Sequence, residues 1–597
     1  MEKADFKNLG LTKEDLSFNG NLNLNFTGNN IDNFLGTARI SNAQLRQKDN
    51  QLSFDSLSII SQIIDGKKSL SLISNEIDAN VTGNFKIMEL PDAVKVLLAR
   101  YYPTYIKAPS YIIKSTQDFT FYVKTNNVDQ YVKLLDKKMG GFNNANISGS
   151  FNLQNYELSL NATIPQFTYD QKEFRNTVLV GKGSRDTLIN DIAVEDIIVN
   201  DSLHLPNSKL RIATSNDLSF IKLNTSASKI FGDAELNASV QTLNDGVKIH
   251  FFPSSFVINN KKWQLDKDGE LTLRKKFLDA SEVKFFQGNQ QIILRTELSE
   301  ENDNTHLVAE LKNVSIEDFA FVLPAKPTLK GLVTGTVTAS DIFGKTNIDF
   351  KGRADSFELD GRYLGKINLN ADANSTTGLI KYKIDAAEND FDFAVDGSYN
   401  YKDSTGKSLQ LNAKVTSLNV NFLQPYLSTV FSDMQGIANG NIEIKNDGED
   451  LSITGNTIIN NGSFKVAYTQ VRYNFDKQPI QFGKNFIDIG TMQIKDTLGN
   501  AGEVSGKMYH KFFKEFVFED MRFSSTKILL LNTGRKDNAQ FYGKVIGKGN
   551  MTLNGDIANM KMNIDGEPSE TDSSHIYLPT GNSRESNVIE ILYSSVL

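Results

Sequence analysis

A strand pattern punctuated by glycine recurs along this 597-residue chain and constrains its fold more than any other feature. One copy runs from Gly20 through Asn-Leu-Asn-Leu-Asn-Phe-Thr to Gly28, and a second runs from Gly440 through Asn-Ile-Glu-Ile-Lys-Asn-Asp to Gly448. Apolar and polar residues alternate in both copies, and this two-residue period makes a strand apolar on one face only. Because the unit recurs, we expect an extended array in which each unit packs on its neighbours.

Alternating runs of the same kind fill most of the remaining chain. They include residues 147–153, 158–162, 348–350, 367–371 and 560–564. Turn residues such as Gly, Asn-Gly and Lys-Asp separate them, as is typical of hairpins. The sequence therefore predicts a mostly β fold, an elongated repeating antiparallel sheet with a few short helices.

Four short segments have helical character instead, namely 90–100, 128–137, 315–323 and 417–431. Pro91 stands in the first turn of the first segment, where proline is well tolerated. Ser315 and Asp318 are placed like a cap at the start of the third. The last two segments are each followed by Gly-x3-Gly and a strand, and their first glycines, Gly331 and Gly436, are 105 residues apart (436 − 331). We therefore predict helix-led units, with boundaries at 1–127, 128–314, 315–416 and 417–597.

Charge and cysteine content exclude several classes of protein. The chain has 64 basic and 71 acidic residues, a net charge of −7, and no long run of one sign, which argues against a nucleic-acid partner. It has no cysteine, so disulfides and thiolate metal sites are excluded. The first strand module begins near residue 16 and no apolar stretch precedes it. We therefore expect the chain to be part of a longer polypeptide with a membrane anchor upstream.

Side chains suited to catalysis or metal binding are scattered. None of the five histidines lies at metal-motif spacing from another. Ser404-Thr-Gly-Lys-Ser408 is similar to the end of a phosphate-binding loop, but Tyr401 occupies the place of its first glycine. Asn446-Asp-Gly-Glu-Asp450 lacks the spacing of a calcium loop. We therefore predict that the protein is not an enzyme and holds no metal or cofactor.

A sheet that is apolar on one face must cover that face. A second sheet would make a sandwich, closure would make a barrel, and lipid would surround an outer-membrane barrel. The single tryptophan, Trp263, disfavours the membrane barrel, which needs aromatic girdles. An open trough filled by acyl chains is a further solution, and it suits a chain with 39 phenylalanines. Composition alone does not separate a filled core from a lipid-lined groove.

Several short blocks between residues 421 and 579 are similar to those of a known family. They include Tyr468-Thr-Gln-Val-Arg-Tyr473, Asn485-Phe-Ile-Asp-Ile-Gly490 and Asp537-Asn-Ala-Gln-Phe-Tyr-Gly543. The other blocks are 440–444, 461–464, 479–482, 494–500, 531–533 and 576–579. Together they resemble the conserved C-terminal region of the TamB proteins, members of the AsmA-like group of bridge-like lipid transfer proteins, in versions from Bacteroidota-type bacteria.

That resemblance implies an elongated β-groove with an apolar concave face in the Gram-negative periplasm. It also implies an inner-membrane anchor, which this chain does not contain, and a BamA-like or TamA-like outer-membrane barrel as partner. Phospholipid acyl chains would be the cargo. The roles proposed for the family are phospholipid transfer to the outer membrane and help in assembling outer-membrane proteins.

Two functional hypotheses follow. In the first, the chain is a periplasmic conduit along whose apolar face phospholipid tails slide. The predicted lining residues are Leu22, Leu24, Phe26, Phe151, Leu153, Ile348, Phe350, Ile442, Ile444, Phe464 and Val466. In the second, the chain is a scaffold whose sheet edges pair with nascent outer-membrane strands, without lipid transport. A stalk of stacked β-sandwiches is a third possibility, and it predicts a closed core.

Overall fold

The structure, a computed structural model, describes most of the chain. The described residues are 4–5, 16–30, 32–47, 50–199, 204–226, 231–298, 305–322, 328–388, 391–405, 408–428, 430–447, 450–539, 541–556 and 559–578. Gly448 of the second repeat copy, Leu323 and Thr429 of the predicted helices, and Pro579 of the last family-like block lie outside them.

Contacts between residues divide the chain into two compact units. Unit 1 comprises Met1–Pro327 and Val333–Gly344, and unit 2 comprises Thr328–Leu332 and Lys345–Leu597. The four helix-led segments predicted from the sequence are smaller than these units, and their boundaries stay a prediction.

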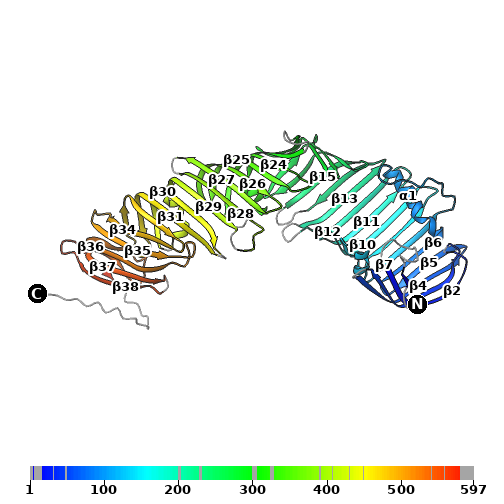
Figure 1. The fold of residues 1–597 in the computed structure, drawn as a ribbon, viewed down its shortest axis with the longest axis horizontal. Coiled ribbons are helices and arrows are strands. Elements are labelled where there is room, and N and C mark those ends of the chain that lie inside the picture. The colour runs from blue at the N-terminus through cyan, green and yellow to red at the C-terminus, as the bar shows by residue number, and fades with distance from the viewer. Residues whose placement is uncertain are drawn as a thin grey trace. The chain divides into compact units, whose positions relative to one another are not determined.

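Unit 1 is built mainly of antiparallel strands, and Figure 1 shows β10 to β13 side by side in chain order. The strands are β1 (Ala4–Asp5), β2 (Leu16–Thr27), β3 (Leu35–Gln47), β4 (Asn50–Ile64), β5 (Lys67–Ser74), β6 (Ile77–Asn84), β7 (Asp118–Thr125), β8 (Met139–Gly141), β9 (Asn146–Asn152), β10 (Glu157–Tyr169), β11 (Lys172–Gly183), β12 (Leu188–Ile198), β13 (His204–Ser215), β14 (Leu218–Thr225), β15 (Phe231–Thr242), β16 (Gly246–Phe251), β17 (Ser254–Ile258), β18 (Lys261–Leu265), β19 (Glu270–Arg274), β20 (Phe277–Ser281), β21 (Val283–Gln287), β22 (Gln290–Leu298) and β23 (Thr305–Ser315). Strand β24 (Leu329–Ser340) is divided between the units.

Unit 2 repeats this architecture with a further set of strands. They are β25 (Asn347–Leu359), β26 (Arg362–Asn374), β27 (Leu379–Glu388), β28 (Phe391–Asn400), β29 (Leu409–Asn419), β30 (Phe431–Asp447), β31 (Asp450–Val466), β32 (Arg472–Phe475), β33 (Gln478–Gly483), β34 (Phe486–Asp496), β35 (Ala501–Tyr509), β36 (Val517–Thr533), β37 (Tyr542–Asp556), β38 (Lys561–Pro568) and β39 (His575–Tyr577). The prediction of a mostly β, repeating antiparallel sheet with few short helices is confirmed.

The two-residue period of the sequence explains the strands. Along β7, exposed and half-buried side chains alternate through all eight residues. Phe119, Phe121 and Val123 lie on the half-buried face, and Tyr122 and Lys124 lie on the exposed face. Alternation of this kind lets a strand join a sheet that has one apolar side.

The helices are short and close to where the sequence predicts them. They are η1 (Ile87–Glu89), α1 (Leu90–Tyr101), α2 (Asp129–Leu135), η2 (Ile316–Val322), η3 (Val420–Leu423) and α3 (Gln424–Leu427). The fourth predicted helix, 417–431, is shorter than expected because β29 continues to Asn419 and β30 begins at Phe431. The Asn419 side chain accepts a hydrogen bond from the Asn421 amide, which starts η3 as an N-cap.

Gly36 follows the first copy of the recurring pattern and Gly455 follows the start of the second, and both glycines have a structural reason. Gly36 (φ 135°) lies directly across from Phe26, and Gly455 (φ 144°) lies directly across from Ile442. A Cβ atom would come within 2.2 Å of a neighbouring-strand carbonyl oxygen at Gly36 and within 2.1 Å at Gly455. No other residue fits such an approach at positive φ, so glycine recurs there.

Candidate functional site: apolar ladders along the sheets

In unit 1, directly opposed residues of successive strands form one continuous apolar row, here called the unit 1 ladder. It crosses thirteen strands, β2 to β7 and β9 to β15. Its members are Leu24, Ala38, Ile59, Leu72, Ala79, Val123, Ile147, Ala162, Leu179, Ile192, Leu210, Leu223 and Leu236. Since residues paired across strands lie on the same face, the register joins side chains that are 212 residues apart in sequence (236 − 24).

The opposite face of the same strands is mainly polar. The row beside the ladder contains Asn23, Arg39, Ser58, Ile73, Asp78, Lys124, Asn146, Thr163, Val178, Ala193, Lys209, Asn224 and Glu235. Solvent-exposed ion pairs lie on this face, such as Arg211 with Asp191 at 2.9 Å and Lys222 with Glu235 at 2.9 Å. The sheet of unit 1 is therefore amphipathic across its strands.

The unit 1 ladder is not covered by a second layer of the described residues. Ala162 is its only buried member, and Ile147 and Leu179 pack half-buried beside it. Leu24 is 51% exposed, and its neighbours on the same face, Leu22 and Phe26, are also exposed. The remaining members are half-buried. This apolar row is in part open to solvent, which differs from the closed core that a β-sandwich would give.

Helix α1 closes one side of the apolar face. Its Ala93, Leu97 and Tyr101 are buried against Phe151 and Leu153, two of the predicted lining residues. Phe151 stands on the same face as the ladder, four residues along β9 from Ile147. Both predicted residues thus lie in a small core beneath α1 rather than in the open part of the face.

In unit 2, a row on the apolar face connects two residues predicted to line the groove. Phe350 and Ile444 are its ends, and Ala371, Tyr382, Gly397 and Leu411 lie between them. Burial raises the pKa of the Tyr382 hydroxyl. Ile348, on the same strand and face as Phe350, is exposed.

A second row, the unit 2 ladder, passes from a half-exposed region into a closed core. Its members are Gly352, Leu369, Ile384, Val395, Ala413, Ile442, Gly455, Phe482, Ile487, Met508 and Phe518. Leu369 to Ile442 are half-buried, whereas Phe482 and the three residues after it are buried. The unit 2 ladder is therefore half-buried over β26 to β30 and buried over β33 to β36.

The remaining predicted lining residues lie against the closed core of unit 2. Phe464, Val466, Ile442 and Ile444 are half-buried and pack against it. The Phe464 ring lies 4.9 Å from the ring of Phe431. Val471, Tyr473, Phe482, Ile487, Ile489 and Ile494, which belong to the family-like blocks, are buried members of this core.

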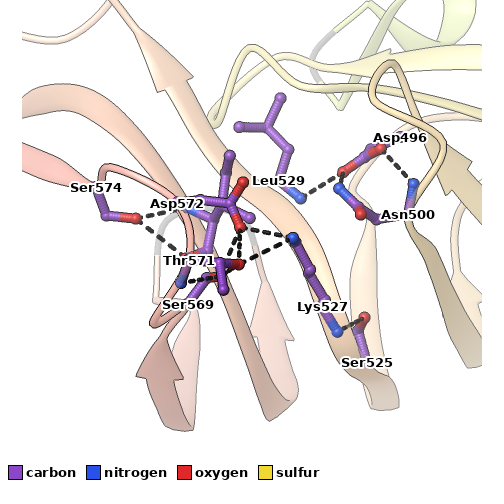
Figure 2. A network of polar contacts seen from close by, with 10 residues as sticks. Asp496, Asn500, Ser525, Lys527, Leu529, Ser569, Thr571, Asp572 and Ser574 are labelled. Atoms are coloured by element: carbon purple, nitrogen blue, oxygen red, sulfur yellow. Dashed lines mark hydrogen bonds and ion pairs between the residues drawn. The ribbon is translucent and has the colours of Figure 1, made fainter.

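A polar network holds this end of unit 2 together (Figure 2). Asp496 accepts hydrogen bonds from the amides of Leu529 (2.7 Å), Leu498 (2.8 Å) and Asn500 (2.9 Å), and from the Asn500 side chain. Burial opposes ionisation of this carboxyl, but the hydrogen bonds outweigh burial and lower its pKa. Nearby, Asp572 pairs with Lys527 at 2.6 Å, and this bond, with one from Ser569, lowers the Asp572 pKa to about 2.

A second buried network lies in unit 1, beneath η2. The carboxylate of Asp318, which is fully buried, accepts hydrogen bonds from Lys261 (2.9 Å), Asn259 (3.1 Å) and Gln290 (3.2 Å). The helix-cap role that the sequence predicts for Ser315 and Asp318 stays a prediction. The contacts of Asp318 hold η2 over β18, β22 and the turn between β17 and β18, with the Phe319 ring 5.8 Å from that of Trp263.

The described residues hold no group of three or more His, Asp or Glu side chains able to bind a metal ion. Among their helices, none has the length and apolar character that a bilayer-spanning segment needs. Comparison with known proteins gives no match, whether to a protein family, to a curated protein or to a solved structure.

Most ladder residues were not among the predicted lining residues. These ladder residues stand in alternating runs like those of the predicted lining residues. Examples are Ile59, Leu72, Ile192, Leu210 and Leu223. Alternation along each strand could have placed them on an apolar face. Which of them stand side by side depends on the register between strands, and no sequence signal gives it directly.

Proposed function

We propose that this chain conducts phospholipids along its apolar face between the inner and outer membranes, in support of outer-membrane biogenesis. The observation that carries the proposal is the unit 1 ladder, an apolar row across thirteen strands that no second layer of described residues covers. An apolar surface of that extent is costly in water and favours an apolar occupant. Acyl chains suit it because they need no polar partner.

The ladder also suits movement along the sheet. Each methylene that leaves water contributes about 0.8 kcal/mol, so a pair of acyl tails would be held firmly. Successive ladder positions are aliphatic throughout, so no position would bind a tail much more tightly than the next. Binding that is strong but uniform permits sliding without covalent chemistry. We accordingly propose a carrier and not an enzyme.

The setting of the proposal comes from the TamB-like blocks in unit 2. By that resemblance we propose a periplasmic location, an inner-membrane anchor and a BamA-like outer-membrane barrel as partner. These parts of the proposal rest on the resemblance alone.

The test combines lipid analysis with paired charge variants. Mass spectrometry of the purified chain should find co-purified phospholipid. Ile192→Asp places a charge on the ladder, and Ala193→Asp places the same charge on the opposite, exposed face of β12. Leu24→Asp and Asn23→Asp form a second pair on β2. We expect ladder variants to lose lipid and their partners to retain it, because an unpaired charge is costly in an apolar channel.

Two results would contradict the conduit hypothesis. One is wild-type protein that carries no phospholipid after extraction from its native membrane fraction. The other is equal lipid content in the ladder variants and their opposite-face partners, with all four proteins folded by circular dichroism.

The scaffold hypothesis has an observation of its own. In the described residues β38 pairs only with β37, and all eight of its residues are exposed. Met562 and Ile564 stand exposed on this strand. An open edge with apolar side chains is able to accept a further strand. Crosslinking from residue 564 decides between the two functions, because capture of outer-membrane precursors by lipid-free protein would favour the scaffold.

A further inference from the structure

Residues 86–114 of unit 1 present three of the four most exposed large apolar side chains among the described residues. Ile112 is 85% exposed, Tyr105 is 75% exposed and Met88 is 69% exposed. Among the described residues only Leu298, at 78%, reaches the same range. Tyr111 is also exposed on this segment. Several such side chains gathered on one segment indicate an interaction surface.

The exposed segment is held on a rigid support. The Tyr111 hydroxyl donates to the Asp92 carboxylate, and the Ser115 hydroxyl donates to Glu89. These bonds fasten residues 111–115 to the start of α1, next to Met88. Helix α1 is itself buried along one side against the sheet. The exposed apolar side chains of this segment therefore stand on a fixed backbone and not on a free loop.

The middle of the segment, where α1 ends, is fastened as well. Asp217, in the turn between β13 and β14, accepts hydrogen bonds from the Thr104 amide (3.1 Å) and the Thr104 hydroxyl (2.6 Å). The Asp217 amide donates to the Tyr101 carbonyl at 2.7 Å. Tyr105 follows directly and points its ring away from these contacts into solvent, as its exposure shows.

The part of this surface that carries Tyr105, Tyr111 and Ile112 is basic. Residues 105–114 contain Lys107 and Lys114 and no acidic side chain, whereas the whole chain has a net charge of −7. The three other basic residues of the segment have acidic partners, Lys86 with Glu89, Lys95 with Asp92 and Arg100 with Asp186. Lys107 donates to the neutral carbonyl of Pro103, so its charge is not cancelled.

We infer that residues 86–114 dock unit 1 onto the surface of a bilayer that contains anionic phospholipid. Tyrosine is well suited to the headgroup region, isoleucine and methionine to the acyl boundary, and lysine to anionic headgroups. The inference deepens the proposed lipid function, because it names where the chain meets a membrane. Ile113 packs against the same buried cluster as Phe119 and Leu158 of the apolar face, so a docked lipid would have that face near it.

Vesicle flotation of the full chain tests the inference. We expect binding to vesicles of phosphatidylethanolamine and phosphatidylglycerol, weak binding to phosphatidylcholine alone, and a decrease with added salt. Met88→Ser/Tyr105→Ser/Ile112→Ser should lower the partition coefficient at least about tenfold, because apolar insertion is lost. Lys107→Gln/Lys114→Gln should lower it on the order of 30-fold at low salt.

A matched control carries the same number of changes elsewhere. Leu298→Ser/Tyr363→Ser/Tyr401→Ser removes three other exposed side chains and should leave vesicle binding unchanged. A tryptophan at position 112 gives a second signal, since the native Trp263 is fully buried. Its emission should shift to shorter wavelength when anionic vesicles are added to Ile112→Trp.

Four outcomes would overturn the inference. They are absence of flotation of the wild-type chain, equal loss in the control triple variant, equal binding to zwitterionic vesicles, or loss of a crosslinked protein partner with unchanged vesicle binding. The last would make the surface a protein-docking site. Co-purified lipid is measured separately, so a chain that floats but carries no lipid would contradict only the conduit.

Discussion

Single buried polar residues fix the elements that cover the apolar face. Asp318 joins η2 to two hairpins through Lys261, Asn259 and Gln290. Asp496 joins the turn at 496–500 to β36 through the Leu529 amide. In each case one carboxylate satisfies several donors that burial would otherwise leave unpaired, and an unpaired donor costs more than an average hydrogen bond provides.

Replacement of Asp318 should therefore destabilise unit 1. We expect Asp318→Ala to lower the free energy of unfolding by about 2–3 kcal/mol, because Gln290 and Lys261 lose their acceptor. Urea titration followed by Trp263 fluorescence measures it, since Trp263 packs beside η2. Asp191→Ala removes an exposed ion pair and should cost less than about 1 kcal/mol. Equal costs for the two variants would contradict the assignment.

His510 should make unit 2 sensitive to mild acid. Its ring stacks on Phe513 at 5.2 Å, Nδ1 accepts from the Phe513 amide, and Nε2 is buried without a hydrogen-bond partner. Burial lowers the pKa of this imidazole from its ordinary 6.5. The unfolded chain then binds the proton more readily, so stability is complete above pH 6.5 and decreases as pH falls below it.

The thermal unfolding midpoint of unit 2 should accordingly decrease when the pH is lowered from 7 to 5. The fall should be smaller in His510→Asn, whose amide oxygen is able to replace Nδ1 as acceptor. His204→Asn, at a partly exposed imidazole, is the control and should behave like the wild type. Identical pH profiles for His510→Asn and the wild type would rule out the proposed role.

At the scale of elements, helix α1 covers one part of a sheet face. Helix α1 buries three residues against Phe151, Leu153 and Leu188, and its outer side carries the exposed Val94. A 12-residue helix is marginal on its own, so its stability comes from this apolar contact.

A pair of truncations separates the two sides of α1. Leu97→Ala, at a buried position, should lower the free energy of unfolding by about 2–5 kcal/mol through lost contact and a cavity. Val94→Ala, on the exposed side, should change it by less than about 1 kcal/mol. Guanidinium titration of both variants measures the difference. Similar midpoints would mean that α1 does not depend on the cluster beneath it.

At the scale of the whole molecule, the length of the unit 1 ladder sets how many lipids unit 1 holds. Twelve steps between thirteen strands, at about 4.8 Å each, give about 58 Å along the sheet. The acyl region of one bilayer leaflet is about 15 Å thick, half of a hydrocarbon core of about 30 Å. We therefore predict that the chain binds more than one phospholipid at once. Native mass spectrometry across a lipid titration measures the number, and saturation at a single lipid would contradict the prediction.

The sequence predicted the class of the fold and most of its helices. The runs around Leu24 and Ile442 alternate clearly, and Pro91 marks α1 correctly, because both signals are local. It also placed apolar residues on one face of their strands. It did not reveal that Phe151 and Leu153 lie beneath α1, since that depends on contact between segments that are more than 50 residues apart (151 − 97).

The sequence by itself determined the alternation that makes each strand amphipathic, and the glycines that allow close approach at Gly36 and Gly455. Only the tertiary structure decided which alternating runs stand in register, and so that Leu24 and Leu236 belong to one uncovered row. It alone decided that the unit 2 ladder closes from Phe482 onward. The reason is that alternation is a property of one strand, whereas register, cover and closure depend on which strands meet.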